Sequence, residues 1–407
     1  RSQYCGLFKA EHDGVTFYFI DNEYYFKRSG LYGFYDDGER FAFFSRAILE
    51  TLFYTDFEPD IINCNDWQTA LTPVYLNLYY RHLDKFNHIK TVFTIHNIAY
   101  QGKYGMDILE DTCGIGARDA HIVEYDGCAN FMKGAIETAD KVTTVSPTYA
   151  GEIQSPEYGE TLDGVLRWRS RDIYGIMNGI DESLFDPATD KAIYANYSLE
   201  DMSGKEKCKE SLRTEFWLDK DASPIIGMVT RFTDQKGLDL VEYAISALME
   251  KGVQFAVLGS GDARYEHLFS WASWRYGGRI AARYSHDPAL ANRIYAGSDM
   301  FLMPSRFEPC GLSQLIALRY GTLPIVRETG GLKDSITPYN KFTGEGLGFT
   351  FRQYNHIDML GAVDRAIEAY RQPDIWKGLM KNAMSAHFTW EKSAGKYIEL
   401  YERLSER

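Results

Sequence analysis

The chain lacks long apolar segments. No run of about 18 apolar residues occurs among its 407 residues, and the opening stretch RSQYCGLFKAEHDG contains no apolar segment like that of a signal peptide. We therefore expect a soluble protein that is not exported. A chain of this length is too long for one ordinary hydrophobic core, so two domains are expected.

Paired cysteines are also missing. The six cysteines are scattered and form no C-x-x-C pair: Cys5, Cys64, Cys113, Cys128, Cys208 and Cys310. This distribution argues against a zinc ribbon or a disulfide framework, and it fits a reducing cytoplasm.

The chain has no excess of positive charge. Its net charge of -13 disfavours nucleic acid as a partner, because proteins that bind nucleic acid neutralise phosphates with clustered Lys and Arg. A neutral polymer or a small molecule is easier to accommodate, and no membrane partner is expected. Aromatic residues make up 15% of the chain, which suits stacking against sugars, although aromatics also fill ordinary cores.

Short β-rich runs alternate with segments that carry apolar residues at helical spacing. The runs are residues 15–21, 60–64, 90–96, 141–146, 173–178, 224–231, 254–259, 279–284, 300–305 and 322–327. This alternation predicts an α/β protein with parallel sheets flanked by helices, built as doubly wound domains.

A polar stretch at residues 186–221 separates the two sets of runs, and we place the domain boundary just before it. The predicted domains are residues 1–178 and 179–388, with residues 389–407 forming a helix that returns to the first domain. Two doubly wound domains that face each other would bind their ligand in a cleft beyond the carboxyl ends of the strands. The polar residues that follow each strand are therefore the candidates for the site.

Two cations follow the run at residues 224–231. Arg231 and Lys236 lie five positions apart, just before a predicted helix, where the Arg fork and the Lys point charge could pair with a diphosphate. Two solvated surface charges would also explain them.

The turn SRFEPCGLSQ follows the strand that ends near Ser305. We expect Gly311 to begin a helix whose free N–H groups receive phosphate or sugar oxygens. Glu308 could accept hydrogen bonds from sugar hydroxyls, or it could be a carboxylate that complements the helix dipole. Cys310 is expected to be a small packed side chain, because no signature of a cysteine enzyme surrounds it.

In the first half, Asp66 follows one strand and is expected to cap a helix. His96 and Asn97 follow the next strand. A capping Asp and a packed His are the ordinary explanations, and contact with a ligand is the alternative.

Taken together, these strand ends resemble one family. The segments CNDWQTAL, VFTIHNIAYQG, VTTVSPTYA, GIMNGID, VTRFTDQKGLDL, SRFEPCGLSQL and TGGLKD closely resemble the bacterial glycogen synthases and plant starch synthases over essentially the whole chain. The resemblance implies a GT-B fold with two Rossmann-like domains. It also implies retaining transfer of glucose from ADP-glucose to the non-reducing end of an α-1,4-glucan, glycogen or starch.

The resemblance further implies roles for particular residues. The implied catalytic residues are His96, Arg231, Lys236 and Glu308, with the two cations on the diphosphate. The implied substrate-binding residues are Asp66, Asn97, Asn178, Tyr284, Cys310, Gly311, Leu312 and Ser313. Among these, the backbone around Cys310 holds the glucosyl group and the distal phosphate, and Tyr284 lies beside adenine.

The implied mechanism uses neither a metal nor a cofactor besides the donor. No pair of acids like that of retaining glycosidases occurs at matching strand ends, so front-face attack is favoured, in which the leaving phosphate helps to accept the acceptor's proton. The D-x-D sequence at Asp219–Asp221 resembles that of metal-dependent transferases, but it precedes a strand and is expected to be solvated.

The family opens with a K-x-G-G-L loop, and the one G-G-L in this chain is Gly330–Leu332, in its second half. We therefore expect the first strands of the N-terminal domain to be absent from this chain, and we expect ADP binding with little or no transfer by this chain alone. The alternative function is a non-catalytic glucan-binding or regulatory fragment of such a synthase. A glucan phosphorylase shares the GT-B plan, but no phosphorylase-like lysine signature for pyridoxal phosphate is seen.

Overall fold

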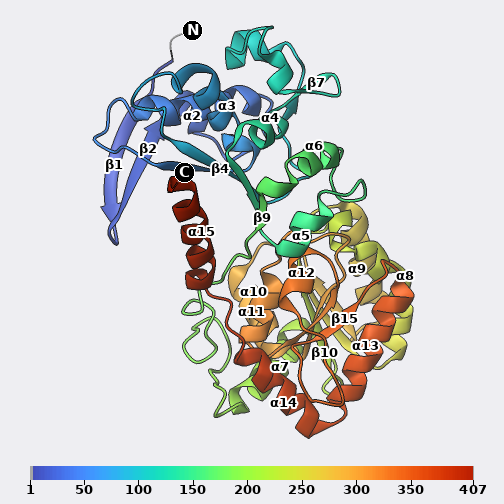
Figure 1. Ribbon diagram of the computed structural model, residues 1–407. Coiled ribbons are helices and arrows are strands. Elements are labelled where there is room, and N and C mark those ends of the chain that lie inside the picture. Colours follow the sequence, from blue (N-terminus) through green and yellow to red (C-terminus); the bar gives the residue numbers. More distant parts are fainter. Residues whose placement is uncertain (1–2, 407) are drawn as a thin grey trace. The chain divides into compact units, whose positions relative to one another are not determined.

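The computed structural model describes residues 3–406 and divides into two compact α/β units (Figure 1). Unit 1 comprises Arg1–Val145, Ala150–Ile176 and Tyr397–Arg407, and unit 2 comprises Ser146–Tyr149 and Met177–Lys396. Each unit contains a parallel sheet flanked by helices, so the expected α/β class is confirmed.

The sheet of unit 1 has four parallel strands in the order β3-β4-β8-β9. They are β3 (Ile61–Asn65), β4 (Lys90–Ile95), β8 (Lys141–Thr144) and β9 (Ile173–Gly175). In β4 every residue after Lys90 is buried, as expected for a central strand covered on both faces. The main helices of the unit are α2 (Asp37–Thr51), α3 (Leu71–Tyr75), α4 (Phe131–Thr138) and α6 (Asp163–Trp168).

The expectation that residues 15–21 belong to a parallel sheet is wrong. They form a strand, β2 (Val15–Asp21), but this strand pairs antiparallel with β1 (Gly6–His12) in a separate hairpin. The turn residues Asp13 and Gly14 have φ of +49° and +77°, the conformation that an Asp-Gly turn favours between antiparallel strands. A third, small sheet joins β5 (Lys103–Tyr104), β7 (Cys128–Asn130) and β6 (Glu124–Tyr125).

The sheet of unit 2 has six parallel strands in the order β12-β11-β10-β13-β14-β15. They are β10 (Ile225–Val229), β11 (Gln254–Leu258), β12 (Ile280–Arg283), β13 (Met300–Met303), β14 (Leu323–Arg327) and β15 (Phe349–Phe351). The last of these, β15, is a short strand that the sequence patterns did not predict.

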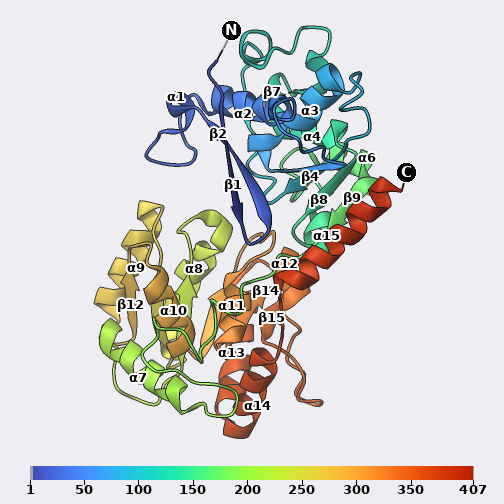
Figure 2. The same ribbon diagram turned by 90° about the vertical axis from the view of Figure 1, so that its left-hand side faces the viewer.

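Helices cover both faces of this sheet (Figure 2). They are α7 (Ser203–Phe216), α8 (Leu238–Glu250), α9 (Ala263–Arg275), α10 (Pro288–Gly297), α11 (Ser313–Arg319), α12 (Gly330–Ser335), α13 (His356–Tyr370) and α14 (Pro373–Met384). Alternate residues of β11 enter different cores: Phe255 and Val257 pack with α8 and α13, whereas Ala256 and Leu258 pack with α7 and α10. This period of two explains why the strand is apolar from Phe255 to Leu258.

The last helix, α15 (Trp390–Ser405), contributes to the core of unit 1. Leu400 and Leu404 are 5% and 6% exposed, and they pack in one cluster with Val92 and Ile176. Helix α5 (Pro147–Glu152) begins in unit 2 and ends in unit 1.

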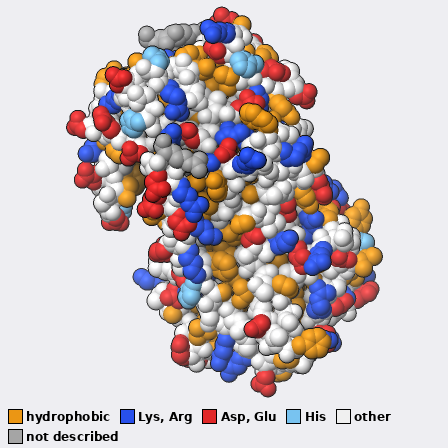
Figure 3. All heavy atoms as spheres, in the orientation of Figure 1, with side chains coloured by type: hydrophobic (Ala, Val, Ile, Leu, Met, Phe, Trp, Pro, Cys, Tyr) orange, Lys and Arg blue, Asp and Glu red, His pale blue; other side chains and the backbone are white. Residues whose placement is uncertain are grey.

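Charges of both signs are interspersed on the face of the molecule shown in Figure 3. Of the helices in the described part of the chain, none combines the length and the apolar character needed to cross a bilayer.

The packing of α15 yields a test with a matched control. Leu400→Ala should destabilise the protein by about 2–4 kcal/mol, because it removes a buried side chain and leaves a cavity. Ile398→Ala, on the exposed part of the same helix, should change stability by less than about 0.5 kcal/mol. Thermal unfolding of both variants measures the difference, and equal melting temperatures would contradict the packing described.

Candidate functional site

An ion pair joins two strand ends of unit 2. Lys236 lies in the short 3-10 turn Asp234–Lys236 after β10, and Glu308 follows β13. The Lys236 Nζ atom lies 2.7 Å from Glu308 Oε2 and 3.0 Å from Oε1. Their side chains are 16% and 7% exposed, so the pair is largely removed from water.

Ser305 holds the same carboxylate from the other side. Its Oγ donates a hydrogen bond of 2.9 Å to Glu308 Oε2, and the serine is buried. Glu308 is therefore fixed by a cation and a hydroxyl before any ligand binds. The sequence did not single out Ser305, although it lies in the turn SRFEPCGLSQ.

Lys236 and Glu308 line a pocket of about 170 Å³ at the carboxyl ends of β10 and β13. Its walls also contain Arg231, Gly311, Leu312 and Ser313. Six of the residues predicted from the sequence are therefore brought together in one place.

Arg231 also lines a second pocket of about 310 Å³, beyond the ends of β10, β11 and β12. Among the described residues no carboxylate pairs with its guanidinium. The other lining residues include Phe185, Ser260, Ser285, His286, Asp287 and Asn292. Because Val229, Thr230 and Arg231 line both pockets, the two are adjacent.

Tyr284 lies next to the second pocket in sequence but does not line either pocket. Its hydroxyl oxygen is 2.8 Å from Ser270 Oγ, and its ring meets Phe232 edge-on. Its neighbours Ser285 and His286 line the pocket instead. The assignment of Tyr284 to adenine stays a prediction.

The expectation that Gly311 begins a helix is wrong. Helix α11 begins at Ser313, and Gly311 lies in the preceding turn with φ of +70°, a conformation that favours glycine. Leu312 is 44% exposed at the pocket. The turn therefore presents backbone from residues 311 and 312 before the helix starts.

Cys310 is buried, with 6% of the residue exposed. Burial raises the pKa of the Cys310 thiol to about 12, and a hydrogen bond with the backbone of Asn178 opposes that shift only in part. The thiol therefore keeps its proton at neutral pH, and a thiolate nucleophile is disfavoured. The hydrogen bond with Cys310 places the backbone of Asn178 next to this thiol.

In unit 1, Asp66 follows β3 and does not cap the turn that it precedes. Its Oδ1 instead accepts a hydrogen bond of 2.8 Å from the backbone N–H of His96, at the end of the neighbouring strand β4. Asp66 has φ of +58° and ψ of -179°, a conformation that is costly for any residue except glycine. Burial raises the pKa of the Asp66 carboxyl above its usual value, and the charge of His96 and hydrogen bonds from the His96 and Asn97 backbone oppose the shift.

His96 and Asn97 complete a small polar cluster at this edge of the sheet. The His96 Nε2 atom lies 2.9 Å from Asn65 Oδ1, and Asn97 Oδ1 accepts a hydrogen bond of 3.0 Å from the Ala99 backbone. Unit 1 thus brings Asp66, His96 and Asn97 together at the ends of the neighbouring strands β3 and β4.

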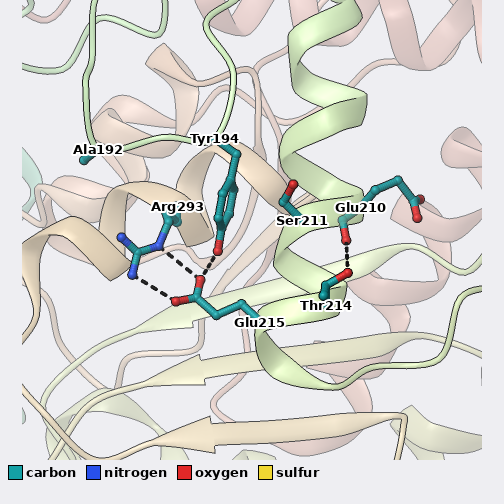
Figure 4. A pocket seen from close by; sticks show the side chains of 7 residues that line it. All are labelled: Ala192, Tyr194, Glu210, Ser211, Thr214, Glu215 and Arg293. Carbon is teal, nitrogen blue, oxygen red and sulfur yellow. Dashed lines mark hydrogen bonds and ion pairs between the residues drawn. The ribbon is translucent and has the colours of Figure 1, made fainter.

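Another pocket of unit 2, of about 690 Å³, contains none of the predicted residues (Figure 4). Its carboxylate Glu215 accepts two hydrogen bonds of 3.0 Å from Arg293 and one from the Tyr194 hydroxyl, so its polar groups already satisfy one another. In the D-x-D sequence, Asp221 forms an ion pair with Arg279, with Oδ2 2.5 Å from Nη1. Within the described residues, no three His, Cys, Asp or Glu side chains are grouped to hold a metal ion.

Comparison with family models matches both units. Residues 1–168 match the starch synthase catalytic domain, and residues 214–378 match the glycosyl transferases group 1. The chain is 50% identical over 410 residues to a glycogen synthase of Clostridium novyi, covering 99% of this chain and 85% of that protein. The chain belongs to the glycogen and starch synthase family.

Another glycogen synthase, from Geobacillus stearothermophilus, is 50% identical over 407 residues and is matched over 84% of its length by 99% of this chain. Among solved structures, the catalytic domain of starch synthase IV from Arabidopsis thaliana, bound to ADP and acarbose, is 36% identical, with a TM-score of 0.89 over 99% of this chain and 85% of that one. A sucrose-phosphate synthase from Thermosynechococcus elongatus, at 18% identity and a TM-score of 0.59, shares the fold. This member of the synthase family therefore has the expected GT-B fold class.

The state of Cys310 can be tested chemically. At pH 8 in the folded protein, iodoacetamide should leave Cys310 unmodified, because its pKa of about 12 keeps the thiol protonated and its burial blocks access. The exposed Cys5 serves as the comparison within the same molecule. Peptide mapping by mass spectrometry measures both sites. Labelling of Cys310 as fast as in denaturant would contradict its burial.

Proposed function

We propose that this synthase transfers glucose, with retention of configuration, from ADP-glucose to the non-reducing end of an α-1,4-glucan. Family membership supports a nucleotide sugar and a glucan as substrate classes. ADP-glucose as the donor, and a reaction without a metal or a further cofactor, belong to the proposal. Residence in the cytoplasm is likewise proposed.

The observation that carries the proposal is the arrangement of two cations around adjoining pockets. Arg231 has no carboxylate partner among the described residues and lines both pockets, whereas Lys236 lines the smaller one. A nucleoside diphosphate could place its phosphates between these cations and its base in the larger pocket. The base would then lie near Phe185 and His286.

The cations also have a role in the reaction. As the bond between C1 of glucose and the β-phosphate oxygen breaks and the bond from C1 to the acceptor O4 forms, negative charge grows on ADP. Arg231 and Lys236 would stabilise that charge, and such a preorganised contribution is commonly worth a few kcal/mol. The acceptor's hydroxyl proton passes to the leaving phosphate, so the products are ADP and a glucan one glucose longer.

Glu308 would act on the sugar of the donor. Glu308 already accepts from Lys236 and Ser305, which leaves lone pairs for sugar hydroxyls on a carboxylate held in place. His96, held by Asn65 and by the backbone contact to Asp66, supplies a ring nitrogen from unit 1. We assign Glu308 to the glucosyl residue, and the glucosyl role of His96 rests on the family resemblance alone.

The ion pair can be tested by removing its cation. Lys236→Ala should weaken ADP binding by about 10- to 100-fold, because it deletes a charge-assisted contact to phosphate. The matched control is Lys251→Ala, which breaks an exposed 2.6 Å ion pair with Asp364 away from both pockets. Calorimetric titration with ADP and with UDP measures affinity and nucleotide preference. Equal ADP affinity in wild type and Lys236→Ala would overturn the assignment.

Substitutions of Glu308 and Cys310 should have different effects on glucose transfer. Glu308→Gln should reduce transfer by about 100-fold or more, because it removes charge next to the reacting sugar while preserving shape. Cys310→Ser should keep a substantial part of the activity, since only the backbone at that position is proposed to touch the ligand. Incorporation of labelled glucose into glycogen measures both variants. A covalent sugar adduct on Cys310 would refute this division of roles.

A further inference from the structure

Gln314, in α11, lies behind the turn that lines the smaller pocket, and its side chain is fully buried. Its Nε2 atom lies within hydrogen-bond distance of three acceptors: the Cys310 carbonyl at 3.1 Å, the Gly311 carbonyl at 2.9 Å and Ser335 Oγ in α12 at 3.1 Å. The two amide hydrogens are therefore shared among these three oxygens. One side chain is therefore hydrogen-bonded to two consecutive carbonyls of the turn.

The surroundings fix which way this amide points. If it were reversed, Gln314 Oε1 would face the carbonyl oxygens of Cys310 and Gly311, and the like partial charges would repel. As placed, Oε1 has no hydrogen-bond partner among the described residues, and it lies 2.5 Å from the position that a Cβ on Gly311 would occupy. The side chain thus fills the space left by the glycine.

Because peptide groups are planar, the hydrogen bonds from Gln314 to the two carbonyls also orient the N–H groups of the same peptides. In a trans peptide the C=O and the following N–H point in opposite directions. Because the carbonyls of Cys310 and Gly311 point at Gln314, the N–H groups of Gly311 and Leu312 point away from it. Gly311 and Leu312 line the pocket, so their N–H groups are directed by Gln314.

A second segment holds the start of the same turn. The Gly331 N–H donates to the carbonyls of Glu308, at 3.1 Å, and Pro309, at 3.2 Å. A Cβ on Gly331 would lie 2.0 Å from the Cys310 carbonyl oxygen, so glycine is required for this approach. The carbonyls of residues 308–311 are therefore all engaged on the side away from the pocket.

Ser335 links the two supports. Its Oγ accepts from Gln314 Nε2 and donates to the Gly331 carbonyl at 2.6 Å, and the serine is buried. Gln314, Ser335 and Gly331 form a connected layer behind the turn.

We propose that Gln314 is a positioning residue that sets the Gly311 and Leu312 N–H groups to receive the distal phosphate of a nucleoside diphosphate. The inference rests on the proposed function, because it assumes that this pocket takes the diphosphate. Gln314 itself touches no ligand. Its effect should therefore depend on whether the nucleotide carries a second phosphate.

The experiment compares ADP with AMP, which lacks the distal phosphate. Gln314→Met keeps the length of the side chain and removes the donor, and it should lower ADP affinity by about tenfold or more while AMP affinity changes less than about twofold. A general loss of structure would weaken both nucleotides alike. Calorimetry on the full chain measures the ratio of the two affinities.

The matched control is Gln254→Met in the same unit. Gln254 is equally buried, and its Nε2 donates to the Asp219 carbonyl at 2.6 Å, but it lines neither pocket. Both Met variants should lower the melting temperature, whereas only Gln314→Met should change the ratio of ADP to AMP affinity.

Ser335→Ala is a second variant, which removes the side chain that Gln314 contacts in α12. If Gln314→Met does not fold, the nucleotide affinities of Ser335→Ala test the inference. It should lower the ratio of ADP to AMP affinity by about two- to fivefold. The substitution removes the contact between Gln314 and Ser335, whereas the hydrogen bonds from Gln314 to the Cys310 and Gly311 carbonyls are kept. An unchanged ratio in the folded variants overturns the inference about Gln314. Failure of the wild type to bind ADP would instead refute the proposed function.

Discussion

The parallel pairing of β10 with β11 on one side and β13 on the other is the constraint on which the site in unit 2 depends. Parallel strands end at the same edge of a sheet, so the segments that follow them meet there. Lys236 and Glu308 are 72 residues apart in sequence, yet their charged atoms approach to 2.7 Å because β10 and β13 are neighbours. The two pockets that share Arg231 follow from the same order, since one lies beyond β10 and β13 and the other beyond β10, β11 and β12.

Removing either partner of the Lys236–Glu308 pair is costly. Both side chains are mostly buried, and removing one partner would leave the other as an uncompensated charge with little water around it. A diphosphate bound as proposed would avoid that cost, because it would bring its own negative charge to the lysine while Ser305 continues to hold the carboxylate. Glu308 is thus held by two side chains, and Ser305 would keep it oriented if Lys236 bound a phosphate.

In unit 1, the backbone of Asp66 is locally strained. Asp66 adopts a backbone conformation that only glycine accepts readily, and it is held there by a hydrogen bond of 2.9 Å from its N–H to the Thr94 carbonyl and by the contact of its carboxylate with the His96 N–H. Such strain persists where the surroundings over-determine it, and it is concentrated at functional sites. Here the contact of Asp66 with the His96 N–H joins the ends of β3 and β4, next to His96 and Asn97.

The sequence by itself determined the α/β class, nearly all strands of the two parallel sheets and the family, because alternating periodicities and motifs such as SRFEPCGL are local properties of the chain. It also placed Arg231, Lys236 and Glu308 at strand ends. It could not distinguish a parallel strand from the antiparallel hairpin at residues 15–21, since both are short apolar runs. Only the tertiary structure decided that Asp66 contacts His96 rather than capping its own turn, that Ser305 and Gln314 support the site, and that Tyr284 lies outside both pockets. These outcomes depend on which strands are neighbours and on which side each peptide faces, and hydrogen bonds between segments far apart in the chain set both.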